Sequence, residues 1–448
     1  MRLTWVQPED LLPHAIVQAR SEGVDVSVVQ QQWVAAGGAA RPAVGGASED
    51  AGQARLRPLA RELLARLDAA TPGYDGDRLE ELQRSWKAAP ALSREVDPQR
   101  QHGAWLGRAA GCLLGKPVEK IPRDGIREIA QATGNWPVSG YFTEVGLPAD
   151  VAARWPWNRR SRPTSLVENI DGMPEDDDLN FAMLALGLFE TAGRPDTEDV
   201  AQAWLDGLPA GRVFTAERIA YRNLLEGVDP NSAGTVRNPF REWIGALIRA
   251  DVHGWVHAGD PHAAARSVHP DAWLSHRRDG LYGALFAAAL AAAALVAEDV
   301  QVVLDAGLSV VPGSSGLAGA VRFGRDLAAT GSSLDDALDA LHREYGHLHW
   351  VHVVNNTALL AYALAAGNGD FVRTTGIAVM GGWDTDSVGA TAGAICGALG
   401  GAAAVPERFA APLHDRIASS LPGFDGSSLA ALAARTDEVR RRLATVAA

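Results

Sequence analysis

Two short runs of acidic residues carry the side chains best suited to chemistry. The first is Glu175-Asp176-Asp177-Asp178, and an apolar stretch with helical periodicity follows it. The second is Asp384-Thr385-Asp386-Ser387, which also leads into an apolar stretch. A helix N-terminus accepts one or two acids as caps, but four adjacent carboxylates repel one another unless a cation compensates them. Capping and metal binding both remain open for the first run.

The donor atoms of the two runs are all oxygen, since neither run contains histidine or cysteine. Oxygen donors suit hard cations such as Mg²⁺, Mn²⁺ or Ca²⁺. Two such ions held about 3.5–4 Å apart can share a water molecule and lower its pKa. The composition of the two runs therefore predicts a site for divalent cations, provided that the fold brings the runs together.

The elements that must position these side chains are predicted to be helices. Helical periodicity recurs along the chain and strand alternation is hard to find, so we expect an all-α fold. The expected helices cover 55–69, 77–87, 103–114, 178–191, 197–206, 215–226, 240–250, 280–297, 299–308, 316–328, 333–345, 355–366, 370–380, 386–404 and 426–444.

The helix expected over 386–404 carries glycines at positions 389, 393 and 397. Small residues at four-residue spacing let another helix approach closely, as they do between membrane helices. We therefore expect this helix to be central, and we expect Asp384 and Asp386 at its start to lie deep in the protein.

The chain is expected to divide near residue 100. Residues 1–100 are predicted to form a small accessory region, with helical patterns at 8–20 and 25–35 and a flexible linker near 35–51. Residues 101–448 are predicted to form one compact multi-helix catalytic domain. The segment 136–174 lacks periodicity and is rich in aromatic residues and arginine, which is typical of either a lid or an anchored surface loop.

Composition narrows the class of protein. The chain has 448 residues, 47% of them hydrophobic, and a formal net charge of −13. This charge argues against nucleic acid or an anionic membrane as the main partner. The two cysteines, Cys112 and Cys396, exclude a disulfide scaffold and favour a cytoplasmic location. The longest apolar stretch, 281–297, is short and alanine-rich, so we expect a buried helix and no membrane span. The oligomeric state is left open.

These motifs resemble those of the ADP-ribosylglycohydrolase family, which includes the dinitrogenase-reductase-activating glycohydrolase. That family carries an early Thr-Asp-Asp-Thr motif and a late Gly-Asp-Thr-Asp-Thr or -Ser motif. The late motif here runs from Gly382 to Ser387 with Trp383 inserted, and the early motif has Glu175 in place of the first threonine.

Further matches extend the resemblance over roughly residues 102–405. The segment 107–119 is similar to the family's Gly-Asp-x-x-Gly-x-x-x-Glu pattern, with Glu119 at the glutamate and Cys112 in place of the aspartate. The segment 275–280 resembles a Thr-His segment of the family and supplies His276. Asn356 falls where related sequences carry an asparagine before the final helices.

The resemblance implies an all-α fold, two Mg²⁺ (or Mn²⁺) ions and cleavage of an N- or O-glycosidic bond at the ribose of an ADP-ribosyl group. The substrate would be small-molecule or protein-linked, and ADP-ribose would be released. Asp177, Glu119 and Asp384 would be catalytic. The implied metal ligands are Glu175, Asp176, Asp177, Asp384, Asp386 and Ser387.

Substrate-binding residues are less strongly specified. The segment 311–316 precedes an expected helix, so Gly313 and Ser315 are candidates for a pyrophosphate, although an ordinary turn and N-cap fits equally well. Trp383 is a candidate for stacking on a flat group, with core packing as the alternative. His276 and Asn356 are the other candidates for substrate contacts.

Two other functions remain open. A divergent enzyme of the same fold, acting on another glycoside, nucleoside or small metabolite, is favoured by Glu175, Trp383 and Cys112, which depart from the family motifs. A catalytically silent binding protein of the same fold is disfavoured, because its metal ligands would be lost and both acidic runs are present here.

Overall fold

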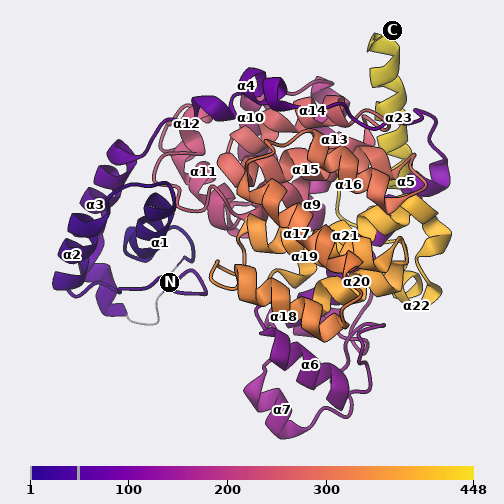
Figure 1. The fold of residues 1–448 in the computed structure, drawn as a ribbon, viewed down its shortest axis with the longest axis horizontal. Helices are drawn as coiled ribbons and strands as arrows, with labels where there is room; N and C mark the ends of the chain where they lie inside the picture. Colours follow the sequence, from indigo (N-terminus) through magenta and orange to yellow (C-terminus); the bar gives the residue numbers. More distant parts are fainter. Residues whose placement is uncertain (1–2, 48–50, 448) are drawn as a thin grey trace.

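The computed structural model describes residues 3–47 and 51–447. Across these residues the regular structure is helical, with isolated bridges in place of strands, which confirms the expected all-α fold (Figure 1). The α-helices are α1 (Pro8–Ser21), α2 (Ser27–Ala35), α3 (Arg57–Ala70), α4 (Leu79–Ser85), α5 (Pro98–Gly115), α6 (Arg123–Ala132), α7 (Ala149–Arg154), α8 (Arg162–Ser165), α9 (Asp177–Ala192), α10 (Thr197–Gly207), α11 (Thr215–Leu225), α12 (Pro230–Ala233), α13 (Asp251–Trp255), α14 (Pro261–Trp273), α15 (Arg278–Ala294), α16 (Val300–Ser309), α17 (Gly316–Ala329), α18 (Leu334–Tyr345), α19 (Val353–Gly367), α20 (Phe371–Met380), α21 (Thr385–Gly400), α22 (Glu407–Ala410) and α23 (Leu429–Ala447).

Helices α5 and α21 lie antiparallel in direct backbone contact. A Cβ atom added to Gly107 would lie 2.1 Å from the Gly393 carbonyl oxygen, and one added to Gly393 would lie 2.1 Å from the Gly107 carbonyl oxygen. Gly111 meets Gly389 in the same way, and so does Gly103 with Gly397. Each pair therefore needs glycine on both helices. The close approach expected from the spacing of the α21 glycines is present.

This contact fixes which residues meet at one end of the pair. At the C-terminus of α5, Gly115 packs against the Thr385 carbonyl oxygen, and the Thr385 hydroxyl donates to the Gly115 carbonyl (2.9 Å). A 3₁₀ turn over Lys116–Val118 follows and delivers Glu119. The first turn of α21, with Asp384 and Asp386, consequently lies beside the segment that carries Glu119.

A second buried helix, α15, supports the centre. Residues 283–295 are all buried, and most of them are alanine. A helix that is apolar on every side belongs in a core, and alanine lets the neighbouring helices α13, α14 and α16 pack closely around it. Among the described helices, none combines the length and apolar content that a bilayer span requires.

The N-terminal helices α1, α2 and α3 pack together at one side of the helical body (Figure 1). Trp5, which precedes α1, is buried against Phe240 and Trp243 of the body, with ring centroids 5.5 Å away in each case. Part of the linker expected near 35–51, residues 48–50, lies outside the described residues. Within the described part, the Val44 carbonyl accepts from the Trp350 indole (3.2 Å).

Some helix boundaries predicted from the sequence were wrong. The segment 240–250 forms a 3₁₀ helix over Ile244–Arg249 and no α-helix. The segment 77–87 begins with a 3₁₀ turn over Asp75–Asp77 before α4. Residues 240–250 are all buried, so contacts with the rest of the protein decide their conformation more than their local pattern does.

We expect Gly111→Ala to lower the free energy of unfolding by about 3 kcal/mol, because the new Cβ would lie 2.0 Å from the Gly389 carbonyl oxygen and the helices would have to separate. Thermal unfolding measures the change. Gly319→Ala in α17 is the matched control, since a Cβ there meets nothing within 4 Å. It should leave stability unchanged or raise it by up to about 1 kcal/mol. Equal effects of the two substitutions would contradict the described packing.

Candidate metal centre

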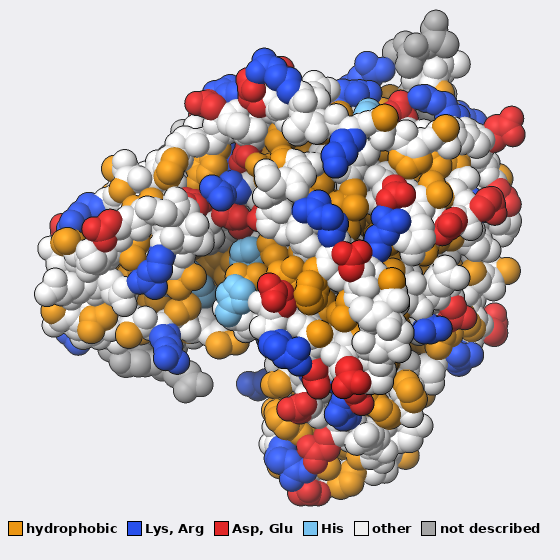
Figure 2. All heavy atoms as spheres, viewed as in Figure 1, with side chains coloured by type: hydrophobic (Ala, Val, Ile, Leu, Met, Phe, Trp, Pro, Cys, Tyr) orange, Lys and Arg blue, Asp and Glu red, His pale blue; other side chains and the backbone are white. Residues whose placement is uncertain are grey.

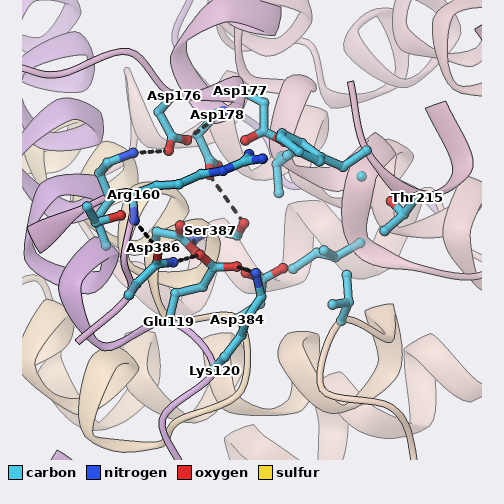
Figure 3. A pocket seen from close by; sticks show the side chains of 18 of the residues that line it. Glu119, Lys120, Arg160, Asp176, Asp177, Asp178, Thr215, Asp384, Asp386 and Ser387 are labelled. Atoms are coloured by element: carbon cyan, nitrogen blue, oxygen red, sulfur yellow. Dashed lines mark hydrogen bonds and ion pairs between the residues drawn. The ribbon is translucent and has the colours of Figure 1, made fainter. Parts of the chain in front are cut away.

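A cavity of about 550 Å³ lies at the end of the α5–α21 pair and receives side chains from both acidic runs. Figure 3 shows Asp176, Asp177 and Asp178 on one side and Glu119, Asp384 and Asp386 on the other, with Ser387 between them. The Ser387 hydroxyl donates to Asp178 Oδ2 (3.2 Å) and joins the two sides. The fold therefore brings together two runs that are about 200 positions apart in the sequence.

Glu119, Asp384 and Asp386 form the first group of potential ligands, with one carboxylate oxygen from each lying within 4.8 Å of the others. The Asp384 backbone N–H donates to Asn356 Oδ1 (3.2 Å), which fixes the start of α21. Glu119 accepts from Asn158 and pairs with Lys120 (3.0 Å). Across the described residues, no ammonium, guanidinium or amide donates to the Asp384 carboxylate.

Asp176, Asp178 and Cys112 form the second group, again with ligand atoms within 4.8 Å of one another. Asp176 caps α9 by accepting from the Asp178 backbone N–H (2.9 Å), and its other oxygen accepts from the Lys116 ammonium. Asp178 accepts from the fully buried Arg108 (3.2 Å). The second group is thus already bound to two cationic side chains of the chain itself.

The pKa values reflect crowding of buried acids. Burial, with the charges of Glu119 and Asp176, raises the pKa of Asp386 to about 7. Burial and the charge of Asp386 raise the pKa of Asp384 well above its ordinary value. Burial raises the pKa of Asp177 in the same way, with Asp176 and Asp386 adding to the effect. Such a set of carboxyls retains protons at neutral pH or binds a cation in their place.

The first group fits a hard divalent cation better than the second. Its three donors are carboxylates, the ligand type that Mg²⁺ and Mn²⁺ prefer. In the second group, burial and the charges of Asp176 and Asp178 raise the pKa of the Cys112 thiol well above its ordinary value, so it stays neutral. A neutral thiol is a poor ligand for a hard cation.

Three of the six expected metal ligands, Glu175, Asp177 and Ser387, lie outside both groups, and the Ser387 hydroxyl already donates to Asp178. Glu175 lines the cavity, but its carboxylate is paired with Arg212 (2.8 Å) and accepts from Ser420 and Asn180. Asp177 also lines the cavity, and among the described residues no neighbouring side chain donates to its carboxylate. Asp177 is therefore available to a molecule in the cavity.

The expected substrate-binding residues are not among those that line this cavity. His276 is fully buried behind Glu217, which does line it, with 3.9 Å between Nε2 and Oε1. Asn356 donates to the Trp350 and His352 carbonyls and positions α21 from behind. Trp383 stacks on His342 at 4.2 Å and lines a neighbouring groove.

The segment around Gly313 and Ser315 forms an ordinary turn and helix cap. The Ser315 hydroxyl accepts from the Ala318 backbone N–H (3.1 Å) and donates to the Pro312 carbonyl (2.7 Å). Neither residue lines the cavity. Of the two interpretations that the sequence left open for this segment, the geometry matches the turn and N-cap.

Several cavity residues were not predicted from the sequence. Lys116 lies one position before Pro117 in an apolar context, and nothing in its spacing indicates an acidic partner sixty positions away. Thr4, Trp5 and Gly45 contribute part of the wall from the N-terminal part of the chain. Figure 2 shows the recess that separates the N-terminal helices from the lower part of the body. The arginines in the lining are Arg159, Arg160 and Arg212.

We expect the affinity for Mn²⁺ to fall roughly ten-fold from pH 8 to pH 6, because a carboxyl with a pKa of about 7 holds a proton that competes with the cation below that pH. Calorimetric titration at the two pH values measures this change. In Asp386→Asn the affinity should be lower and its pH dependence flatter. Equal affinity of the unmodified protein at both values would contradict the assignment of Asp386 as a ligand.

The chain is similar to known proteins. A protein of Archaeoglobus fulgidus described as uncharacterized is 26% identical over 316 residues, which are 69% of this chain and 90% of that protein. A solved structure described as an ADP-ribosylglycohydrolase-related protein complex matches with a TM-score of 0.42 and 20% identity, over 77% of this chain and 98% of that one. The family model for ADP-ribosylglycohydrolases matches residues 93–444. The chain therefore belongs to the ADP-ribosylglycohydrolase family.

Proposed function

We propose that this protein is a metal-dependent hydrolase that cleaves the glycosidic bond of an ADP-ribosyl substrate and releases ADP-ribose. The observation that carries the proposal is the cavity in which Glu119, Asp384 and Asp386 converge within 4.8 Å, with Asp177 exposed to the same space. Family membership supports the same reaction.

A divalent cation held by Glu119, Asp384 and Asp386 would bind and orient ribose hydroxyls next to the scissile bond. The chain's own residues then have separate tasks. Asn356 and Thr385 fix the start of α21 and so keep the two aspartates in place. Asp177, which has no side-chain donor among the described residues, is the group placed to take or give a proton.

The rim of the cavity carries positively charged side chains that could bind a diphosphate group. Arg159, Arg160 and Arg212 line it, and the guanidinium groups of Arg160 and Arg218 lie 5.6 and 5.1 Å from the centre of the Phe214 ring. Arginine binds phosphate oxygens through paired N–H donors, and a ring beneath the guanidinium holds it in position. A volume of about 550 Å³ is in the range of small-molecule sites.

The second candidate function is hydrolysis of another glycoside or nucleoside by the same centre. Cys112 favours it, because it places a thiol where the family motif has an aspartate, and Glu175 and Trp383 also depart from the family motifs. The shared motifs also support a resemblance to the dinitrogenase-reductase-activating type. The bond between ADP-ribose and its acceptor is identified by the experiment below. A catalytically silent protein is disfavoured by the intact first group of ligands.

The test is incubation of the purified protein and Mg²⁺ or Mn²⁺ with arginine- and serine-linked ADP-ribosyl peptides, O-acetyl-ADP-ribose and simple nucleosides, with mass spectrometry of the products. Release of ADP-ribose that is lost with EDTA and in the Asp384→Asn/Asp386→Asn double variant would support the proposal and identify the linkage. Cleavage of nucleosides alone would support the second candidate and contradict the first.

We expect Asp177→Asn to lower kcat by about 10²–10⁴-fold, the usual contribution of a proton-transfer group, while the affinity for Mn²⁺ changes only a few-fold. Steady-state kinetics and calorimetry on the same preparation separate the two effects. Asp326→Asn, which makes the same change at an exposed site on α17, is the control and should leave both values unchanged. A kcat for Asp177→Asn close to that of the control would rule out the assigned role.

A further inference from the structure

The Lys116 side chain lies inside the centre, among the carboxylates. Its ammonium donates to Asp176 and to the Glu175 carbonyl (3.3 Å). The side chain is only 8% exposed. The second group thus contains an ion pair whose positive charge is supplied by the chain itself.

Arg108 adds a second cation on the same side. It is fully buried and donates to the Asp178 backbone carbonyl (3.0 and 2.9 Å) and to the Asp178 carboxylate (3.2 Å). Its guanidinium also pairs with the carboxylate of Asp251. Asp176 is therefore paired with Lys116, and Asp178 is paired with Arg108, which it shares with Asp251. A further divalent ion placed there would meet two positive charges at short range in a poorly solvated space.

The hydrogen bonds lead to the same conclusion. Both oxygens of Asp176 accept, one from the Asp178 backbone N–H and the other from Lys116. Both oxygens of Asp178 also accept, from Arg108 and from Ser387. The remaining donor of this group is the neutral thiol of Cys112. The second group has neither an uncommitted carboxylate nor a complete set of hard ligands.

The first group has the opposite balance. Three carboxylates face one ammonium, that of Lys120, whose side chain is 47% exposed. Two negative charges remain, and one divalent cation would neutralise them. Asp384 has no cationic donor among the described residues, so this half of the centre depends on a cation from solution.

We propose that this centre binds one divalent cation, at Glu119, Asp384 and Asp386, and that the Lys116 ammonium takes the place of a second. The inference rests on the proposed metal-dependent function and replaces the two ions expected from the sequence. Lys116 is a positioning residue, which holds Asp176 and the start of α9 without a metal ion.

The number of bound ions tests the inference directly. The full-length protein is saturated with Mn²⁺, and bound manganese per chain is measured by native mass spectrometry and elemental analysis. We expect one ion per chain in the unmodified protein and two in Lys116→Met, because the substitution leaves Asp176 without its cation. Lys87→Met is the matched control, a lysine at an exposed position that does not line the cavity, and it should keep one ion.

Electron paramagnetic resonance of the Mn²⁺-loaded unmodified protein gives a readout that does not depend on any variant. A single ion gives the six-line signal of isolated Mn²⁺, whereas two ions a few ångströms apart give a spin-coupled spectrum. A coupled spectrum, or two ions per unmodified chain, would overturn the inference and leave the proposed function intact.

The remaining outcomes are also distinct. One ion per chain in a folded Lys116→Met protein would overturn the role of Lys116. Absence of bound manganese from the unmodified protein would overturn both the metal centre and the inference. One bound ion without release of ADP-ribose from any substrate would contradict the proposed substrate and support the count of one ion.

Discussion

The packing of α5 on α21 through backbone atoms sets the geometry of everything else in the centre. Glycines at four-residue spacing on both helices remove the side chains between them, and the opposing carbonyl groups leave no room for a Cβ. Because each helix turns by about 100° per residue, a slip of one residue would bring side chains into the interface. The register is therefore fixed, and with it the approach of Glu119 to Asp384 and Asp386.

The second constraint is the balance of charge in a buried space. Carboxylates from three segments converge there, and burial and mutual repulsion raise the pKa of Asp177, Asp178, Asp384 and Asp386. On the side of α9, Lys116 and Arg108 compensate the charge from within the chain. On the side of α21, the compensation has to come from solution. The two acidic runs look alike in the sequence, but their surroundings give them different tasks.

Local signals in the sequence predicted much of this arrangement. Periodicity gave the helical class, the α21 glycines indicated a deep position for Asp384, and motif resemblance identified Glu119. What could not be predicted depends on pairing between distant segments. The partner of Lys116 lies sixty positions away. Trp383 is directed to His342 of α18 by the left-handed backbone at its own position (φ 63°). His276 is covered by the network around Glu217, and Trp5 reaches the cavity only because the N-terminal helices pack against the body.

The most direct test of the centre is a crystal structure of the Mn²⁺-soaked protein with anomalous diffraction at the manganese edge. We expect the strongest anomalous peak between the carboxylates of Glu119, Asp384 and Asp386, with the Lys116 ammonium still on Asp176. A strongest peak among Asp176, Asp178 and Cys112, or no peak beside Asp384, would contradict the assignment of the first group as the metal site.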